Sequence, residues 1–308
     1  MPTHLLSHSA NPADLKAALQ KIRERIKQGG DKKHVSVAVQ LQLLDELSQF
    51  DFGRFLIQNR GINGYWTNYM LTHPWFGRKT KKNNRGQSFS VLEQFLLDKA
   101  PSVLATQERF QIFLRENQKA VRDEAILATI PSGMMGELLY LDYQGVQCIG
   151  LIGIDYDSQA LSDAKMLAAK QQLLDFVELV ESDAWSLPIE AQFDLISSNG
   201  LSIYEADDAK VLKLYKEFYR ALKPKGKLVT SFLTFPPALT TECEWLMENI
   251  NDEDLLLQQI IFLDILDAKF QCFRSSAQTE HYLAAAGFKD IAFIYDSARI
   301  FPTVIAEK

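Results

Sequence analysis

The stretch AILATIPSGMMGELLYLDYQGVQCIGLIGID, from Ala125 to Asp155, decides the fold of this chain. An apolar run ends at a Pro-Ser-Gly turn, a short helical pattern follows, and a second apolar run ends at an acidic residue. This order is typical of a nucleotide-binding βαβ unit, in which the turn and the first amides of the helix approach the ligand. A carboxylate that ends the second strand can accept both hydroxyls of a ribose. The stretch therefore predicts an adenosine site.

The spacing within the turn restricts the kind of adenosine ligand. Gly133 and Gly136 match the last two glycines of the pattern G-x-G-x-x-G, but Pro131 stands at the first position. The missing glycine forms the tight turn of a dinucleotide site, so the pattern argues against a bound pyrophosphate. Asp155 follows Gly133 by 22 residues, close to the spacing of about 20 expected for a ribose-binding carboxylate. Its neighbour Asp157 can cap the following helix, which leaves Asp155 available to a ligand.

Short apolar runs alternate with helical patterns through the rest of the chain. The predicted strands are Ala125 to Ile130, Cys148 to Ile154, Phe176 to Val180, Phe193 to Ser198 and Lys227 to Phe232. This alternation predicts an α/β fold with a parallel sheet that is covered on both faces. Two further runs, FKDIAFIYD and ARIFPTVIAEK, are joined by a few residues around Ser297. So short a connection predicts an antiparallel hairpin, since a parallel crossover needs a dozen residues or more.

Polar and aromatic residues follow the predicted strands at their carboxyl ends, where open α/β sheets bind ligands. After the third strand, Asp183 can accept from an adenine amino group and Trp185 can cover the ring, although Asp183 also suits a plain turn and Trp185 the core. Tyr156, next to Asp155, can lie against a purine or pack at the strand end. After the fourth strand, Ser198 and Asn199 stand where a reacting atom would lie, but such residues are also ordinary turn formers.

The first 120 or so residues have a different, helical character. Asn11 is a good N-cap for a helix whose apolar residues recur from Leu15 to Ile26, and three further helices fit the periodicity before residue 121. Between them, RGINGYWTNYMLTHPWFG is rich in Gly, Asn and aromatic residues and predicts a loop that covers or lines a site. We therefore expect two parts, residues 1–122 and residues 123–308.

Composition excludes several classes of protein. The 308 residues include three widely separated cysteines, and none of the five histidines has metal-ligand spacing with another, so we expect no metal site and a reducing compartment. Without a long apolar run, the chain is expected to be soluble and cytoplasmic, with no membrane partner. A net charge of −6 argues against a nucleic-acid partner. The basic segment 77–86, GRKTKKNNRG, is either a solvated loop or a patch for an anionic substrate.

In their order and spacing, the motifs from Glu124 to Lys308 resemble a class I S-adenosylmethionine-dependent methyltransferase. The resemblance rests on the glycine turn, on GID at Asp155, on ESDAW and on FDLISSNG. It also rests on Lys223-Pro224-Lys225-Gly226, which resembles the family's turn before its fifth strand, and on AAAGF before the final hairpin. It implies a Rossmann-like, mostly parallel sheet of the seven-stranded type with a C-terminal antiparallel hairpin, and S-adenosylmethionine as cofactor.

The resemblance also assigns roles to residues. Asp155 would bind the ribose, Asp183 would accept from the adenine amino group, and Ala184 would offer a backbone contact. The turn would hold the methionine moiety, but the family has an acidic residue where Ala128 and Thr129 stand here. The amino and carboxyl ends of the cofactor are therefore expected to bind partly to other groups, including groups of the N-terminal region. The expected cofactor-binding residues are Pro131, Ser132, Gly133, Gly136, Asp155, Tyr156, Asp183, Ala184, Trp185, Ser198 and Asn199.

Methyl transfer from a sulfonium is an in-line displacement, so the protein mainly aligns the acceptor, excludes water and removes a proton where needed. The expected catalytic residues are Asn199, Tyr65 and His73, the last as a general base. Tyr65, Trp66 and Tyr69 are candidates to cover the sulfonium, which an aromatic face attracts by about 0.5 to 2 kcal/mol. Alternatively, these rings attach the N-terminal region to the rest of the chain.

The predicted function is methyl transfer to a small molecule or an exposed side chain. One alternative is a methyltransferase-like binding or regulatory protein without turnover. The other is an NAD-dependent oxidoreductase, against which the missing first glycine and the terminal hairpin both count.

Overall fold

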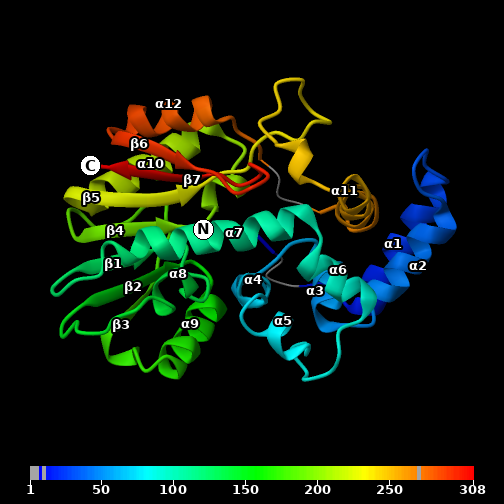
Figure 1. Cartoon of the computed structure of the whole chain (residues 1–308), viewed down its shortest axis with the longest axis horizontal. Coiled ribbons are helices and arrows are strands. Elements are labelled where there is room, and N and C mark those ends of the chain that lie inside the picture. Colours follow the sequence, from blue (N-terminus) through cyan, green and yellow to red (C-terminus); the bar gives the residue numbers. More distant parts are fainter. Residues whose placement is uncertain (1–6, 9–11, 269–271) are drawn as a thin grey trace. The chain divides into compact units, whose positions relative to one another are not determined.

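The computed structural model describes residues 7–8, 12–268 and 272–308. The chain forms two compact units, which are described separately below (Figure 1). The helical unit comprises Met1–Gln107 and Met247–Phe270, and the sheet unit comprises Glu108–Leu246 and Gln271–Lys308. The division expected from the sequence, after residue 122, did not include the return of residues 247–270 to the helical unit.

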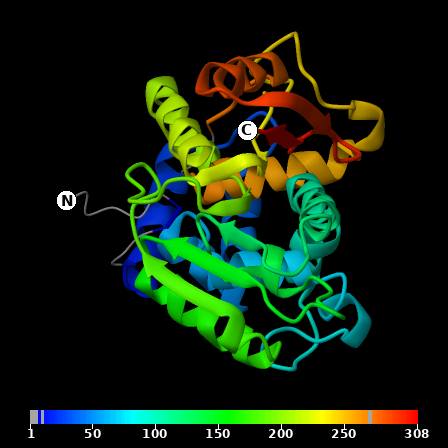
Figure 2. The ribbon, with the colours of Figure 1, turned by 90° about the vertical axis from the view of Figure 1, so that its left-hand side faces the viewer.

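The sheet unit contains one sheet of seven strands in the order β3-β2-β1-β4-β5-β7-β6. The strands are β1 (Ile126–Thr129), β2 (Gly150–Asp155), β3 (Val177–Glu181), β4 (Phe193–Ser198), β5 (Leu222–Ser231), β6 (Lys289–Ile294) and β7 (Thr303–Glu307). Strands β1 to β5 are parallel, and β7 lies antiparallel between β5 and β6. The predicted Rossmann-like sheet with an antiparallel C-terminal hairpin is therefore confirmed, and Figure 2 shows how its strands twist.

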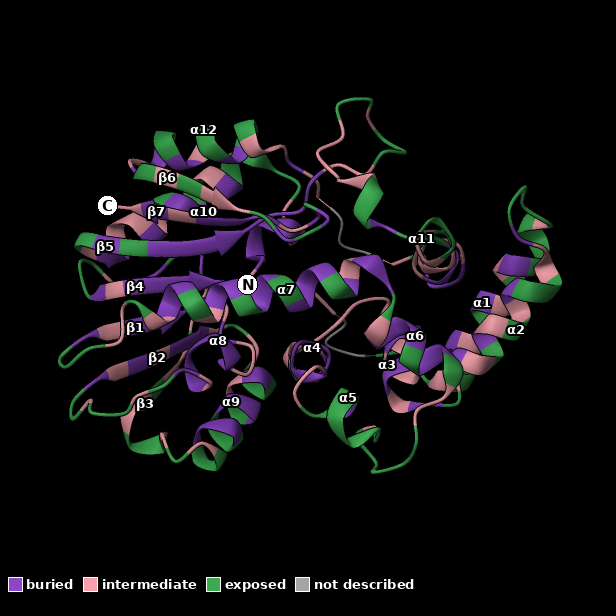
Figure 3. Ribbon diagram, in the orientation of Figure 1, coloured by how far each residue is buried: buried purple, intermediate pink, exposed green. Residues whose placement is uncertain are grey.

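Helices cover the sheet because its apolar strands cannot face water. The helices of this unit are α8 (Gly136–Leu139), α9 (Ser158–Lys170), α10 (Asp208–Ala221), α12 (Ser276–Ala286) and the last part of α7 (Pro101–Gln118). Strands β1 and β4 are buried along most of their length, as Figure 3 shows. The core between the layers includes Leu127, Leu151 and Leu195 from three strands, with Phe113 from α7.

The segment Lys223-Pro224-Lys225-Gly226 is not a separate turn before β5. It lies inside β5, where the pairing with β4 shifts register between Phe193 and Leu195. Lys225 has a positive φ of 64°, and a Cβ on Gly226 would lie 2.8 Å from the Lys223 carbonyl oxygen. The segment is therefore an irregularity within the strand, of the kind that a bulge produces.

The helical unit is built from short helices. They are α1 (Leu15–Gly29), α2 (Val37–Leu47), α3 (Asp51–Asn59), α4 (Gly64–Thr72), α5 (Gly77–Thr80), α6 (Val91–Asp98), the first part of α7, α11 (Asp252–Gln259) and the π-helix η4 (Ile260–Ile265). Helix α1 is capped by Asp14, which accepts from the Ala17 N–H at 3.1 Å. The expected cap, Asn11, lies outside the described residues.

Helix α4 occupies the segment for which the sequence predicted a loop. Asn63 caps it and accepts from the Trp66 N–H at 3.0 Å, and both Trp66 and Met70 are buried. The prediction was wrong because the segment mixes aromatic and polar residues without a single apolar stripe, which hides the helical period.

The core of the helical unit explains why residues 247–270 belong to it. Ile260, Ile261 and Ile265 are buried in the same apolar cluster as Leu44 and Leu96, which lie more than 150 residues earlier in the chain.

Within the described residues, no helix combines the length and the apolar character that a membrane crossing requires.

Candidate functional site

Asp155, at the end of β2, joins its own strand to the turn that follows β1. Its Oδ2 accepts from the Gly133 N–H at 2.9 Å, and its Oδ1 accepts from the Asp157 N–H at 3.0 Å. Burial raises the pKa of Asp155, while these backbone donors oppose the rise. Each carboxylate oxygen can accept more than one hydrogen bond, so Asp155 can fix the turn and still bind two hydroxyls.

The turn itself is anchored mainly to the protein. Ser132 donates its N–H to the Ile154 carbonyl at 2.8 Å, and Met135 donates to the Ser132 carbonyl at 2.6 Å. Helix α8 is a single turn of four residues. The N–H groups of Ser132, Gly133 and Met135 already donate to the protein, so fewer amides are available to a ligand than the sequence suggested. Pro131 and Gly133 are half-buried, whereas Ser132 and Gly136 are buried.

Met135 replaces a possible ligand contact with packing. It is fully buried with a positive φ of 57°, and it lies over Gly153 of β2. A Cβ on Gly153 would lie 2.6 Å from the Met135 sulfur, so a side chain there would have to displace Met135. In the turn after β1, the side chain of Met135 therefore fills the space over Gly153 of β2.

The residues expected at the adenine end lie at the neighbouring strand end. The Ser182 N–H donates to the Asp155 carbonyl at 3.0 Å, which ties the segment after β3 to the end of β2. Asp183 Oδ1 accepts from the Trp185 N–H at 3.0 Å, and Trp185 Nε1 donates to the Lys210 carbonyl at 2.9 Å. Ala184 is buried and Asp183 half-buried, while Tyr156 is exposed. The residues predicted to bind adenosine thus lie at the ends of β2 and β3.

The end of β4 and the segment that follows it are bonded to β5 and to α8. Ser198 is buried, and its carbonyl accepts from Thr230 Oγ1 at 3.1 Å. The Asn199 side chain donates to the Glu137 carboxylate. Its Oδ1 is buried without a hydrogen-bond partner among the residues that the structure describes.

Two charged residues of this region were missed by the sequence reasoning. Arg109 of α7 is 5% exposed and Glu137 of α8 is 6% exposed. The spacing held a signal for Arg109, because it lies four residues after Ala105 and four before Phe113, both of which are buried. An arginine on the apolar face of a helix indicates a buried charge with a specific partner.

The expected aromatic cover is largely internal to the helical unit. Trp66 stacks on Phe52 with ring centroids 5.3 Å apart, and the Tyr69 hydroxyl donates to Glu93 Oε1 at 3.0 Å. Trp66 and Tyr69 therefore belong to the packing of that unit and not to a free cover. Tyr65 is 40% exposed, and its ring contacts Trp66 edge-on at 5.0 Å.

His73, the predicted general base, is buried within the helical unit. Its side chain has no exposed area, and its Nε2 lies 3.0 Å from Asp98 Oδ1. Burial lowers the pKa of His73, and Asp98 opposes this effect. Gly77 packs so closely on the ring that a Cβ there would lie 2.3 Å from Nδ1. His73 is thus enclosed within the helical unit in this structure, and its role as a general base stays a prediction.

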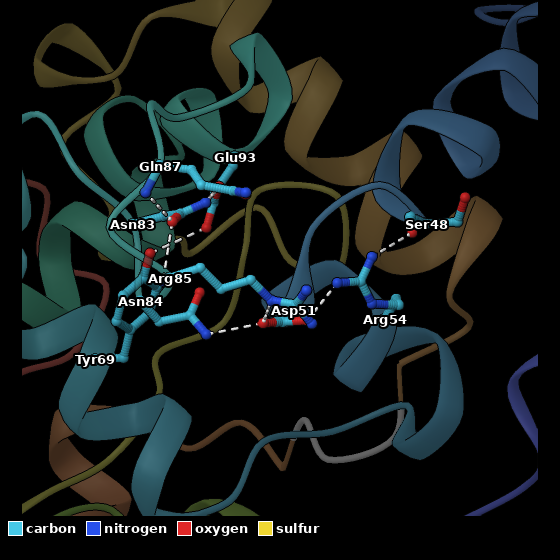
Figure 4. Close-up of polar contacts among 9 residues, drawn as sticks. All are labelled: Ser48, Asp51, Arg54, Tyr69, Asn83, Asn84, Arg85, Gln87 and Glu93. Atoms are coloured by element: carbon cyan, nitrogen blue, oxygen red, sulfur yellow. Dashed lines mark hydrogen bonds and ion pairs between the residues drawn. The ribbon is translucent and has the colours of Figure 1, made fainter.

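The basic segment 77–86 is partly neutralised (Figure 4). Arg85 pairs with Asp51 at the start of α3, where Asn84 also donates at 2.9 Å, and Arg54 pairs with the same carboxylate. The hydrogen bond from Arg85 holds the pKa of Asp51 well below its usual range, helped by Asn84 and Arg54. We call Asp51, Arg54, Asn84 and Arg85 the Asp51 cluster. It ties the segment to the body of the helical unit.

The comparisons with known proteins agree with this geometry. A family model described as a methyltransferase domain matches residues 133–230, the range that contains Asp155, Asp183 and Asn199. No curated protein matches the chain. A crystal structure of a protein from Bordetella parapertussis, described as a possible exported protein, is 42% identical with a TM-score of 0.88 over 96% of this chain and 95% of that chain.

Weaker matches include methyltransferases from two other bacteria. The S-adenosylmethionine-dependent enzyme of Aquifex aeolicus is 15% identical with a TM-score of 0.44, over 71% of this chain and 93% of that one. The enzyme of Mesorhizobium loti is 18% identical with a TM-score of 0.47, over 65% and 98%. Residues 133–230 therefore match a methyltransferase domain, and the seven strands of the sheet unit have the order and directions of the class I S-adenosylmethionine-dependent methyltransferase fold.

Proposed function

We propose that this protein is an active enzyme that moves a methyl group from S-adenosylmethionine to a small molecule or an exposed side chain by in-line displacement. The observation that carries the proposal is the position of Asp155, which ends β2 and holds Gly133 of the turn after β1. A carboxylate in that position faces the place where the family binds its cofactor, at the carboxyl ends of the parallel strands.

The residues present fit the cofactor. Asp155 and Asp183 follow adjacent parallel strands, so one can bind the ribose while the other accepts from the adenine. The buried Asn199 Oδ1 lacks a partner within the described part of the chain, which leaves an acceptor for a ligand near the end of β4. When bound, the cofactor supplies an activated methyl group on a sulfonium.

The protein's own part in the reaction is binding, orientation and exclusion of water. Asn199 is proposed to contact the methionine part of the cofactor, which carries the reacting sulfonium, with Ser198, Tyr156, Ala184 and Trp185 beside the adenosine. The helical unit is proposed to supply the acceptor-binding part, with Tyr65 as its exposed aromatic candidate. We also propose a cytoplasmic location, although the Bordetella parapertussis relative is described as a possible exported protein.

Isothermal titration with S-adenosylmethionine and S-adenosylhomocysteine tests the cofactor assignment. Asp155→Ala should weaken binding by about 1.5 to 3 kcal/mol, the scale of lost hydrogen bonds to a charged group. Asp175→Ala, which removes an exposed carboxylate of the same unit, is the matched control and should bind as the wild type does. If the wild type gives no heat and no thermal shift at millimolar ligand, the proposal fails.

A second measurement separates an enzyme from a binding protein. Release of S-adenosylhomocysteine should be followed with a panel of small-molecule and peptide acceptors. A protein that binds S-adenosylmethionine tightly but releases no product with any acceptor would favour the regulatory alternative. The family match does not favour the NAD-dependent alternative.

A further inference from the structure

Five polar side chains, three of them buried and two half-buried, gather at the carboxyl end of β4, and the glycine turn does not account for them. We call them the Arg109 cluster. They come from α7, α8, the segment after β4, and the end of β5 (Figure 1), and they all belong to the sheet unit. The cluster consists of Arg109, Glu137, Asn199, Tyr204 and Ser231.

Arg109 is held rigidly at the centre of the cluster. Its Nη1 donates to Ser231 Oγ at 3.3 Å, and its guanidinium carbon lies 4.7 Å above the centre of the Phe301 ring. Gly200 has a positive φ of 81°, and a Cβ there would lie 3.4 Å from Arg109 Nη1, so the backbone passes close to the guanidinium. Burial lowers the pKa of Arg109 to about 10, which leaves the group charged at neutral pH.

Glu137 supplies the opposite charge. Its carboxylate accepts from the Asn199 side chain and from its own backbone N–H, and it attracts Arg109. Burial raises the pKa of Glu137. Asn117 of α7 fixes the start of α8 by donating to the Glu137 carbonyl at 3.1 Å and to Ser197 Oγ at 3.0 Å. Asn117 thus fixes the backbone of Glu137, while Asn199 holds its carboxylate.

Two polar atoms of the cluster are left unsatisfied. Arg109 Nε is a buried donor and Asn199 Oδ1 a buried acceptor, and neither has a hydrogen-bond partner in the portion of the chain that the structure describes. Leaving a buried polar group unpaired costs roughly 1 to 3 kcal/mol, so such groups usually await a ligand or water. A ligand that fits both must present an acceptor to Arg109 and a donor to Asn199. With Glu137 beside Asn199, the preferred donor is a cation and the preferred acceptor an anion.

We infer that the Arg109 cluster binds the amino-acid end of the cofactor, with Arg109 on its α-carboxylate and Asn199 with Glu137 on its α-ammonium. This rests on the proposed function. The first motif of this chain has Ala128 and Thr129 where an acidic residue is expected, and the amides of its turn are largely bonded within the protein. The cluster replaces what that motif lacks.

Two ligands distinguish this role from any other. 5′-Methylthioadenosine shares the adenosine and the thioether of S-adenosylhomocysteine but has no amino-acid end. Arg109→Gln and Glu137→Gln should each lower the affinity for S-adenosylhomocysteine about ten- to hundredfold, which is the scale of hydrogen bonds to charged groups. The affinity for 5′-methylthioadenosine should change less than about twofold, within the effect of a distant surface change. Arg115→Gln is the matched control, because it removes an exposed arginine from the same helix.

Each outcome of these titrations is decisive. A wild type that binds neither ligand overturns the proposed function itself. If the wild type binds S-adenosylhomocysteine but the variants lower the affinities for both ligands equally, or for neither, only the role of the cluster is overturned. Variants that keep full cofactor affinity but raise the KM of an acceptor would assign the cluster to the acceptor instead, which also overturns the inference.

Folding of the variants is checked by circular dichroism and by the binding stoichiometry. If Arg109→Gln does not fold, Arg109→Lys retains the charge but loses the planar fork that holds a carboxylate. Arg109→Lys should still bind S-adenosylhomocysteine less tightly relative to 5′-methylthioadenosine than the wild type does. If this ratio of affinities is unchanged in both Arg109→Lys and Glu137→Gln, the inference is rejected.

Discussion

Each unit of this protein contains an arginine-carboxylate cluster, and the two differ in how fully their polar atoms are paired. In the Asp51 cluster of the helical unit, both carboxylate oxygens accept from Arg85, with Arg54 and Asn84 adding further donors (Figure 4). In the Arg109 cluster of the sheet unit, Arg109 Nε and Asn199 Oδ1 are buried without partners among the described residues. The first cluster faces solvent, whereas the second is enclosed.

The difference shows how a stabilising cluster is told from a binding one. A network whose donors and acceptors are all paired needs nothing more, and its contribution is to the stability of the fold. A buried network that lacks one donor and one acceptor is incomplete in a specific way, and the missing pair describes the ligand. Position supports this reading, since only the Arg109 cluster lies where open α/β sheets bind ligands.

Breaking the buried pair should have the largest effect. Arg109→Met leaves Glu137 buried without its counter-charge, and it should lower the free energy of unfolding by about 3 to 5 kcal/mol in urea unfolding followed by circular dichroism. Arg109→Met combined with Glu137→Gln should cost less than the two single changes added together, because the second change removes the stranded charge. Strict additivity would show that the two groups do not interact.

Breaking the exposed cluster should have a smaller effect that depends on pH. Asp51→Asn should lower the free energy of unfolding at pH 7 by about 1 kcal/mol, because solvent screens the arginines, and it should leave cofactor affinity unchanged. The folded-state pKa of Asp51 lies below its ordinary 3.8, so its stabilisation is present above that value and is lost as the pH falls. The difference between variant and wild type should therefore shrink from pH 7 to pH 3, and a difference that grows would reject this assignment.

The exposed lysines of segment 77–86 should matter least. Lys79→Gln and Lys82→Gln change solvated charges, and each should alter the free energy of unfolding by less than about 0.5 kcal/mol. A reduced rate with an acidic acceptor, at unchanged stability, would instead assign this segment to substrate binding.

The sheet could be predicted closely because its signals are local. Strand β4 was expected from Phe193 to Ser198 and is observed there, and the terminal hairpin followed from the shortness of its connection. Strands of a parallel sheet are covered on both faces, so they appear in the sequence as short continuous apolar runs that can be recognised without knowledge of distant contacts.

The missed features depend on contacts between distant residues. Arg109 meets Ser231 and the Phe301 ring, which lie more than 120 positions further along the chain. Helix α4 was missed because its residues are buried on more than one side. The burial of His73 was missed because Asp98 and Gly77, which enclose it, contact it only in the folded chain. Composition and spacing show which residues carry chemistry, but not which of them the tertiary fold encloses.

The return of residues 247–270 to the helical unit has a consequence for synthesis on the ribosome. The first 107 residues of that unit emerge early, but Ile260, Ile261 and Ile265, which complete its core, follow about 150 residues later. At typical elongation rates this is a delay of roughly 8 to 30 seconds. During that interval the apolar surface that these three isoleucines cover in the finished unit has no permanent partner, so the nascent chain is expected to need a chaperone until residue 265 has left the ribosome.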